Sequence, residues 1–135
     1  MKGILADANI KGYVDLLVAL MQGESWKLFW DHLQLRYVQF SELGLSAEAS
    51  DELVWQTCQK NDLYLITDNR TKKGADSLEA AIRSQNTPSC LPVFTIASVQ
   101  RIRSSREYAE KVVESLLQYL MQEENIRGTG RLFLP

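Results

Sequence analysis

Short apolar segments alternate along this 135-residue chain with segments that carry apolar residues at helical spacing. The short segments are rich in aliphatic, aromatic or β-branched residues, as strands are, and cover residues 3–6, 35–40, 63–67 and 93–97. When strands and helices alternate, the strands form a parallel sheet and the helices cover its two faces. The sequence therefore predicts a three-layer α/β/α domain with a central parallel sheet of four or five strands.

Between these segments, apolar residues recur at steps of three and four residues, which is typical of amphipathic helices. The clearest such pattern covers residues 108–120, behind Ser104 and Glu107, which have the spacing of a capping box. Ser25 is expected to cap a short helix at residues 26–30. The other predicted helices lie at about residues 10–21, 53–58 and 78–82.

The C-terminal end of the chain has weaker structural signals. Residues 126–135 contain Gly128 and Gly130 and are expected to form a loose tail behind a domain of residues 1–125. The apolar run 132–134 could dock as an edge strand or bind a partner, and the sequence leaves both possibilities open.

The charge of the chain is unevenly distributed. Its net charge of −2 gives no reason to expect nucleic acid, and its 45% hydrophobic and 24% charged residues are ordinary for a soluble protein. Residues 70–106, however, contain seven basic and two acidic residues, so this segment is +5 and the remainder is −7. A basic segment beside an acidic site suits a phosphodiester ligand. For any one of these residues, a solvated face with scattered Lys and Arg is an equally good interpretation.

The cysteines and apolar runs indicate where the protein resides. Cys58 and Cys90 lack CxxC spacing, cannot form a zinc site alone, and are expected to be thiols in a reducing compartment. Asp7 interrupts the first apolar stretch, so we expect no signal peptide. The densest apolar run, residues 16–21, is far shorter than the ~20 residues of a membrane span. The sequence predicts a cytoplasmic protein without a membrane partner.

Two of the predicted strands run straight into aspartates. Asp7 follows residues 3–6, and Asp68 with Asn69 follows residues 63–67. The carboxyl ends of parallel strands meet at one edge of a sheet, where ligands bind. Asp51 would join them there, because it begins the helix that precedes the second of these strands. Carboxylates with an amide oxygen form a hard ligand set, which suits Mg²⁺ or Mn²⁺.

Such an ion acidifies a bound water and neutralises phosphodiester charge, so the chemistry requires no histidine. His32 is the only histidine and is expected to be a structural or surface residue. Ser/His/Asp or Cys/His catalysis is therefore not expected.

The order of these motifs resembles the PIN-like domain family, and most of all its small bacterial branch. The resemblance rests on the strand before Asp7, on the helix opening Ser50-Asp51-Glu52-Leu53, and on residues 62–70, and it spans residues 3–98. It implies a parallel α/β/α fold and a Mg²⁺- or Mn²⁺-dependent acidic site that cleaves RNA or other nucleic acid. Several members of the family are toxins neutralised by a small antitoxin-like protein, and dimers are common.

The family pattern transfers unevenly to this chain. Asp7 matches the first family aspartate, and Asp51 matches the helical acid with Glu52 as its competitor. The next family acid follows a threonine with one residue between them, which lands on Asn69. Either Asp68 has taken that role or Asn69 is a neutral ligand.

A last family acid would come from Asp76 or Glu79. The sequence thus predicts catalytic residues Asp7, Asp51 and Asp68, metal ligands Asp7, Asp51, Asp68, Asn69 and Asp76, and RNA-binding residues Arg70, Lys72 and Lys73.

Two other functions remain open. The first is a catalytically degraded PIN-like module that binds or regulates through protein contacts. The second is a phosphoryl-transfer domain with Asp7 as the nucleophile, although Asn9 stands where the dehalogenase pattern requires an acid. Each candidate acid can also be a turn or cap residue, and the tryptophans are expected to be core or interface anchors: Trp26, Trp30 and Trp55.

Overall fold

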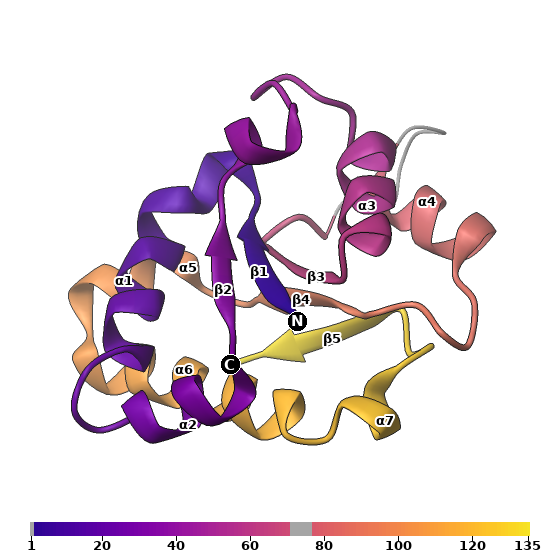
Figure 1. Ribbon diagram of the computed structural model, residues 1–135. Helices are drawn as coiled ribbons and strands as arrows, with labels where there is room; N and C mark the ends of the chain where they lie inside the picture. Colours follow the sequence, from indigo (N-terminus) through magenta and orange to yellow (C-terminus); the bar gives the residue numbers. More distant parts are fainter. Residues whose placement is uncertain (1, 71–76) are drawn as a thin grey trace.

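A five-stranded, all-parallel sheet forms the centre of the protein (Figure 1). The computed structural model describes residues 2–70 and 77–135. The strands lie in the order β2-β1-β3-β4-β5. Their bounds are β1 Gly3–Ala6, β2 Arg36–Val38, β3 Leu63–Thr67, β4 Val93–Ile96 and β5 Arg131–Leu134. The predicted parallel α/β/α fold is confirmed, with the larger of the two expected strand numbers.

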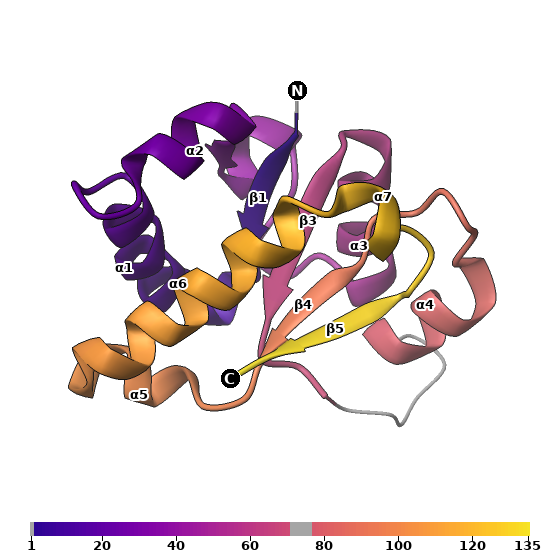
Figure 2. The ribbon, with the colours of Figure 1, turned by 90° about the horizontal axis from the view of Figure 1, so that it is seen from below.

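Helices cover both faces of this sheet, as Figures 1 and 2 show. One layer contains α1 Lys11–Met21, α2 Lys27–Leu33, α5 Val99–Ser104, α6 Arg106–Leu120 and α7 Glu123–Ile126. The other contains α3 Asp51–Lys60 and α4 Leu78–Gln85. Two short 3-10 turns, η1 Ala8–Ile10 and η2 Phe40–Leu43, follow β1 and β2.

The core consists of two clusters, one on each face of the sheet. Successive side chains of a strand point to opposite faces, so Ile4 enters the cluster under α1 and α6 while Leu5 enters the cluster under α3 and α4. Tyr64 and Leu65 divide in the same way. Burial on both faces explains why the inner strands β1, β3 and β4 are nearly continuous apolar runs rather than alternating ones.

The order of the strands creates a switch point between β1 and β3. The chain passes from β1 to β2 on one side and from β3 to β4 on the other, so the crevice beyond the adjoining ends of β1 and β3 is open to a ligand. Ala6 pairs with Ile66, and the backbone N–H of Asp7 donates to the Ile66 carbonyl at 2.9 Å. This pairing brings Asp7 beside the end of β3.

The C-terminal segment differs from the loose tail that the sequence suggested. Residues Arg131–Leu134 form β5, which pairs in parallel with β4 and completes the sheet. Leu134 is 2% exposed and lies in the core under α6. The edge-strand alternative is therefore confirmed. The segment from residue 126 onwards belongs to the domain and is not a loose tail.

Two helix starts also differ from prediction. Ser105, not Ser104, caps α6, because its side chain accepts the Tyr108 N–H and Ser104 is the last residue of α5. α2 starts after Trp26 without a side-chain cap, so Ser25 does not cap it.

The tryptophans lie in or against the core, and the histidine lies at the surface, as the sequence suggested. Trp30 and Trp55 are buried in the two core clusters, and Trp26 packs partly against the first. His32 is on the exposed side of α2. Within residues 2–70 and 77–135, no helix combines the length and apolar character needed to cross a membrane.

The docking of β5 predicts unequal effects of two neighbouring truncations. Leu134→Ala should lower the free energy of unfolding by about 2–4 kcal/mol, because it leaves a cavity in the core. Phe133→Ala is the matched control and should cost under about 1 kcal/mol, since Phe133 is 57% exposed. Urea unfolding followed by circular dichroism measures both, and equal losses would contradict the docked strand.

Candidate functional site

A polar cavity of about 490 Å³ lies beyond the carboxyl ends of β1 and β3. The side chains that give it charge are Asp7, Asp51, Asp68 and Arg70, and Asn69 lines it beside them. The structure thus brings together the three aspartates that the sequence singled out, with one of the predicted basic residues. Lys72, Lys73 and Asp76, the other predicted site residues, lie outside the described residues.

Asp7 is fixed at the end of β1 by two hydrogen bonds. Its Oδ1 accepts the Ala8 N–H at 2.8 Å, which starts η1, and its Oδ2 accepts the hydroxyl of Thr67 at 2.7 Å. Burial raises the pKa of Asp7, the two hydrogen bonds oppose that rise, and the charges of Asp51 and Asp68 add to it. The net pKa is raised, chiefly because burial penalises the charged form of the carboxyl group.

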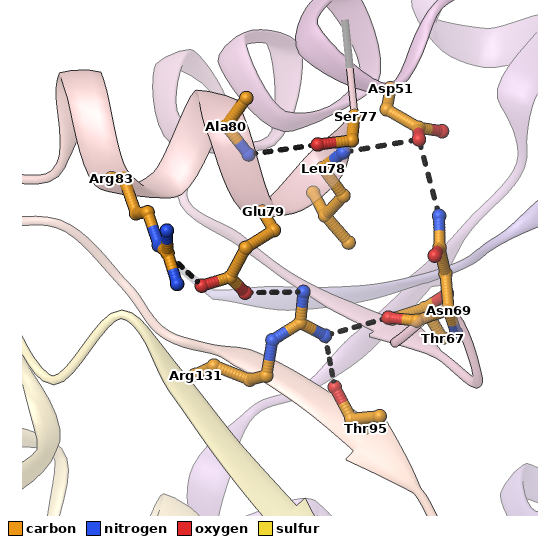
Figure 3. Close-up of polar contacts among 10 residues, drawn as sticks. All are labelled: Asp51, Thr67, Asn69, Ser77, Leu78, Glu79, Ala80, Arg83, Thr95 and Arg131. Carbon is orange, nitrogen blue, oxygen red and sulfur yellow. Dashed lines mark hydrogen bonds and ion pairs between the residues drawn. The ribbon is translucent and has the colours of Figure 1, made fainter. Parts of the chain in front are cut away.

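Asp51 connects three segments around the cavity. It lies in the first turn of α3, which Ser50 caps. Its Oδ2 accepts the side-chain amide of Asn69 at 3.1 Å and the N–H of Leu78, at the start of α4, at 3.1 Å (Figure 3). Oδ1 of Asp51 receives no hydrogen bond from the described residues. Oδ2 of Asp51 therefore holds the surrounding segments together, while Oδ1 is available to a ligand.

Glu52, the competitor of Asp51, has a different role. Its carboxylate is exposed and accepts the side-chain amide of Gln85 on α4 at 2.8 Å. Glu52 does not line the cavity, so Asp51 is the helical acid of the site.

The sequence left open whether Asp68 or Asn69 takes the place of the third family acid, and the two side chains have different contacts in the structure. The N–H of Asn69 donates to the Thr67 hydroxyl oxygen at 3.0 Å, and its side-chain amide donates to Asp51. Asp68 lines the cavity and makes no hydrogen bond with the described residues. Asp68 is thus the member of this pair with a carboxylate open to the cavity, while Asn69 donates to Asp51.

Arg131, on β5, holds the loop that carries Asp68 and Asn69. Its guanidinium donates to the carbonyl of Asn69 at 2.8 Å and to the hydroxyl of Thr95 at 2.6 Å, and pairs with Glu79 at 3.3 Å (Figure 3). The Arg131 side chain is only 9% exposed. Glu79 also pairs with Arg83 and does not line the cavity, so this candidate for the last family acid is engaged elsewhere.

Sequence reasoning missed Arg131 and Thr67. Arg131 falls in the segment expected to be a tail, and its only signal is that it opens a β-prone run. Thr67 is fully buried and hydrogen-bonded to Asp7, and its signal is a polar residue at the end of an apolar strand. Arg70 lines the cavity and donates to the Ala97 carbonyl at 3.3 Å, beyond the end of β4.

The donor set fits a hydrated divalent ion better than a closed metal cage. Within the described part of the chain, no group of three or more His, Cys, Asp or Glu side chains is arranged to hold a metal ion. Mg²⁺, however, is usually bound by one or two carboxylates and several waters. Asp7, Asp68 and Oδ1 of Asp51 supply carboxylate oxygens around a cavity with room for those waters.

The fold and the cavity define a class: an α/β protein with a carboxylate-lined cavity at the switch point of a parallel sheet. Comparisons of the chain with protein-family models, with curated proteins and with solved structures found no match. The resemblance to the PIN-like family therefore stays a prediction.

Arg131 and Arg83 both pair with Glu79, but their contacts predict that they contribute unequally to the free energy of unfolding. Arg131→Met should lower the free energy of unfolding by about 2–3 kcal/mol, because it removes a buried ion pair and the donor to the Asn69 carbonyl. Arg83→Met is the matched control and should cost below about 0.5 kcal/mol, since Arg83 is 68% exposed. Chemical unfolding measures both, and equal effects would refute a structural role for Arg131.

The raised pKa of Asp7 predicts that its charge destabilises the metal-free protein. The folded state holds the Asp7 proton more tightly than the unfolded state, so this stability contribution falls as pH rises above the unfolded value of 3.8. Asp7→Asn should therefore raise the melting temperature at pH 7 in a chelating buffer, and the gain should shrink towards pH 3.5.

Asp15 on α1 provides a control of opposite sign. Partial burial raises its pKa, but hydrogen bonds from Tyr37 and Lys11 outweigh this and lower it. Asp15→Asn should therefore reduce the melting temperature at pH 7. A lower melting temperature for Asp7→Asn at both pH values would contradict the account of Asp7.

Proposed function

We propose that this protein is a Mg²⁺- or Mn²⁺-dependent nuclease of PIN type that hydrolyses phosphodiester bonds in RNA. The observation that carries the proposal is the shared cavity of Asp7, Asp51 and Asp68, with Arg70 at its margin. Its position at the switch point of a parallel sheet is where open α/β proteins bind ligands. The resemblance in motif order to PIN-like domains points to the same chemistry.

In this proposal each side chain has a distinct task. Asp7, Asp68 and Oδ1 of Asp51 would hold the ion, which supplies an acidified water and neutralises charge on the phosphate when it is bound. Thr67 would keep the Asp7 carboxylate in place through its hydroxyl. Arg70 would hold a phosphate of the strand, since a guanidinium forms charge-assisted hydrogen bonds with phosphate oxygens.

A PIN-like binding or regulatory module is the second candidate. It is favoured by Asn69, which stands at the expected acid position and donates to Asp51 instead of adding a carboxylate. α2 also exposes Leu28 and Phe29, by 83% and 42%, beside the half-buried Trp26. In this alternative such a surface would contact a small antitoxin-like protein or a second copy of the chain.

Cleavage of RNA distinguishes these two candidates. With labelled single-stranded RNA and Mn²⁺, Asp7→Asn and Asp68→Asn should each lower the rate about 100-fold or more, because each removes a carboxylate from the site. Glu52→Gln is the matched control, since Glu52 neighbours Asp51 but lies outside the cavity, and should retain full activity. Cleavage that persists in excess EDTA, or in Asp7→Asn, would reject the nuclease proposal.

A further inference from the structure

A second cavity, of about 300 Å³, adjoins the carboxylate cavity. Ala8 and Ala47 line both cavities, so the two share a wall. The second cavity lies at the carboxyl ends of β1 and β2 and has a mainly apolar lining that includes Leu5 and Val38. Its other lining side chains include two aromatic rings and one amine, from Tyr37, Phe40 and Lys11.

Two residues that line this second cavity, Tyr37 and Lys11, contact Asp15 on α1. The Tyr37 hydroxyl donates to Oδ1 of Asp15 at 2.7 Å, and Nζ of Lys11 lies 3.2 and 3.1 Å from the two carboxylate oxygens. Burial and the Asp15 carboxylate raise the pKa of Tyr37, so its hydroxyl remains a donor at neutral pH. This hydrogen bond orients the ring of Tyr37 before any ligand binds, which reduces the entropy lost on binding.

We infer that the second cavity binds an unpaired nucleobase of a single-stranded nucleic acid whose phosphodiester group lies in the carboxylate cavity. The inference rests on the proposed function, because that function places a phosphodiester group in the carboxylate cavity. The apolar cavity shares a wall with the carboxylate cavity, so a base attached to that group could reach it. Bases of single strands stack on aromatic side chains while basic side chains bind the backbone. Tyr37 and Phe40 supply aromatic rings in the second cavity, and Arg70 supplies a basic group in the adjoining one.

The volume of the cavity favours a single base. A volume of about 300 Å³ is at the lower end for small-molecule sites. A base within a duplex is stacked and paired, so it would have to leave the helix before it could enter. Gln39 and Ser41 also line the cavity and offer polar side chains to the edge of the base. The substrate expected from this site is therefore single-stranded.

The test compares the binding of two oligomers of equal length, one of single-stranded RNA and one of abasic ribose phosphate. Fluorescence anisotropy with the full chain carrying Asp7→Asn avoids cleavage during the measurement. The RNA should bind about tenfold more tightly than the abasic oligomer, which is the range for one stacked base. Double-stranded RNA should bind no better than the abasic oligomer.

Two further substitutions, each added to this chain, assign the difference to the second cavity. Ser41→Trp should fill the cavity and abolish the preference for RNA, whereas Ser41→Ala should retain it; Ser41 is exposed, so the fold should tolerate both. Tyr37→Ala should also abolish the preference, and Tyr37→Phe, which keeps the ring, should not. Circular dichroism checks that each variant is folded.

The outcomes separate this inference from the nuclease proposal. Equal binding of the two oligomers, no binding of either, or a preference unchanged by Ser41→Trp and Tyr37→Ala would overturn the base site, even if Mn²⁺-dependent cleavage is found. A base preference that these two variants abolish, without cleavage by the wild-type chain, would support the base site and reject the nuclease.

Discussion

The parallel pairing of β1 with β3 places Asp7 beside Thr67, and the rest of the site depends on that contact. The backbone bond from Asp7 to Ile66 continues the pairing by one residue, and the buried Thr67 hydroxyl then binds the Asp7 carboxylate. The same hydroxyl oxygen accepts the N–H of Asn69 and so turns the chain after β3. One buried threonine thereby fixes both strand ends that carry the candidate acids.

The cavity is also supported by residues far away along the chain. Asp51 joins the starts of α3 and α4 to the loop after β3, and Arg131 ties that loop to β4 and β5. The groups that support the site therefore also hold the layers of the fold together. The described residues leave Asp68 and Oδ1 of Asp51 without hydrogen bonds, so both are available to a ligand. Each oxygen of Asp7 accepts one hydrogen bond and keeps a second lone pair for an ion.

The parts of the site that follow from local patterns could be predicted from the sequence. Asp7 and Asp68 directly follow apolar strands, and parallel strands place such residues at one edge. Arg131 could not be identified in this way, because its role depends on β5 pairing with β4 and on partners up to 62 residues distant. Nor could Asp51 be separated from Glu52, since successive helical residues point in different directions and only the packing of α3 decides which faces the cavity.

Binding of a divalent ion by the three aspartates is the central claim, and a crystal structure of the wild-type protein soaked in Mn²⁺ tests it most directly. The account predicts an anomalous peak in the carboxylate cavity, bound directly or through one water by Asp7, Asp68 and Oδ1 of Asp51. A well-ordered cavity without such a peak, or a peak held by other residues, would contradict it.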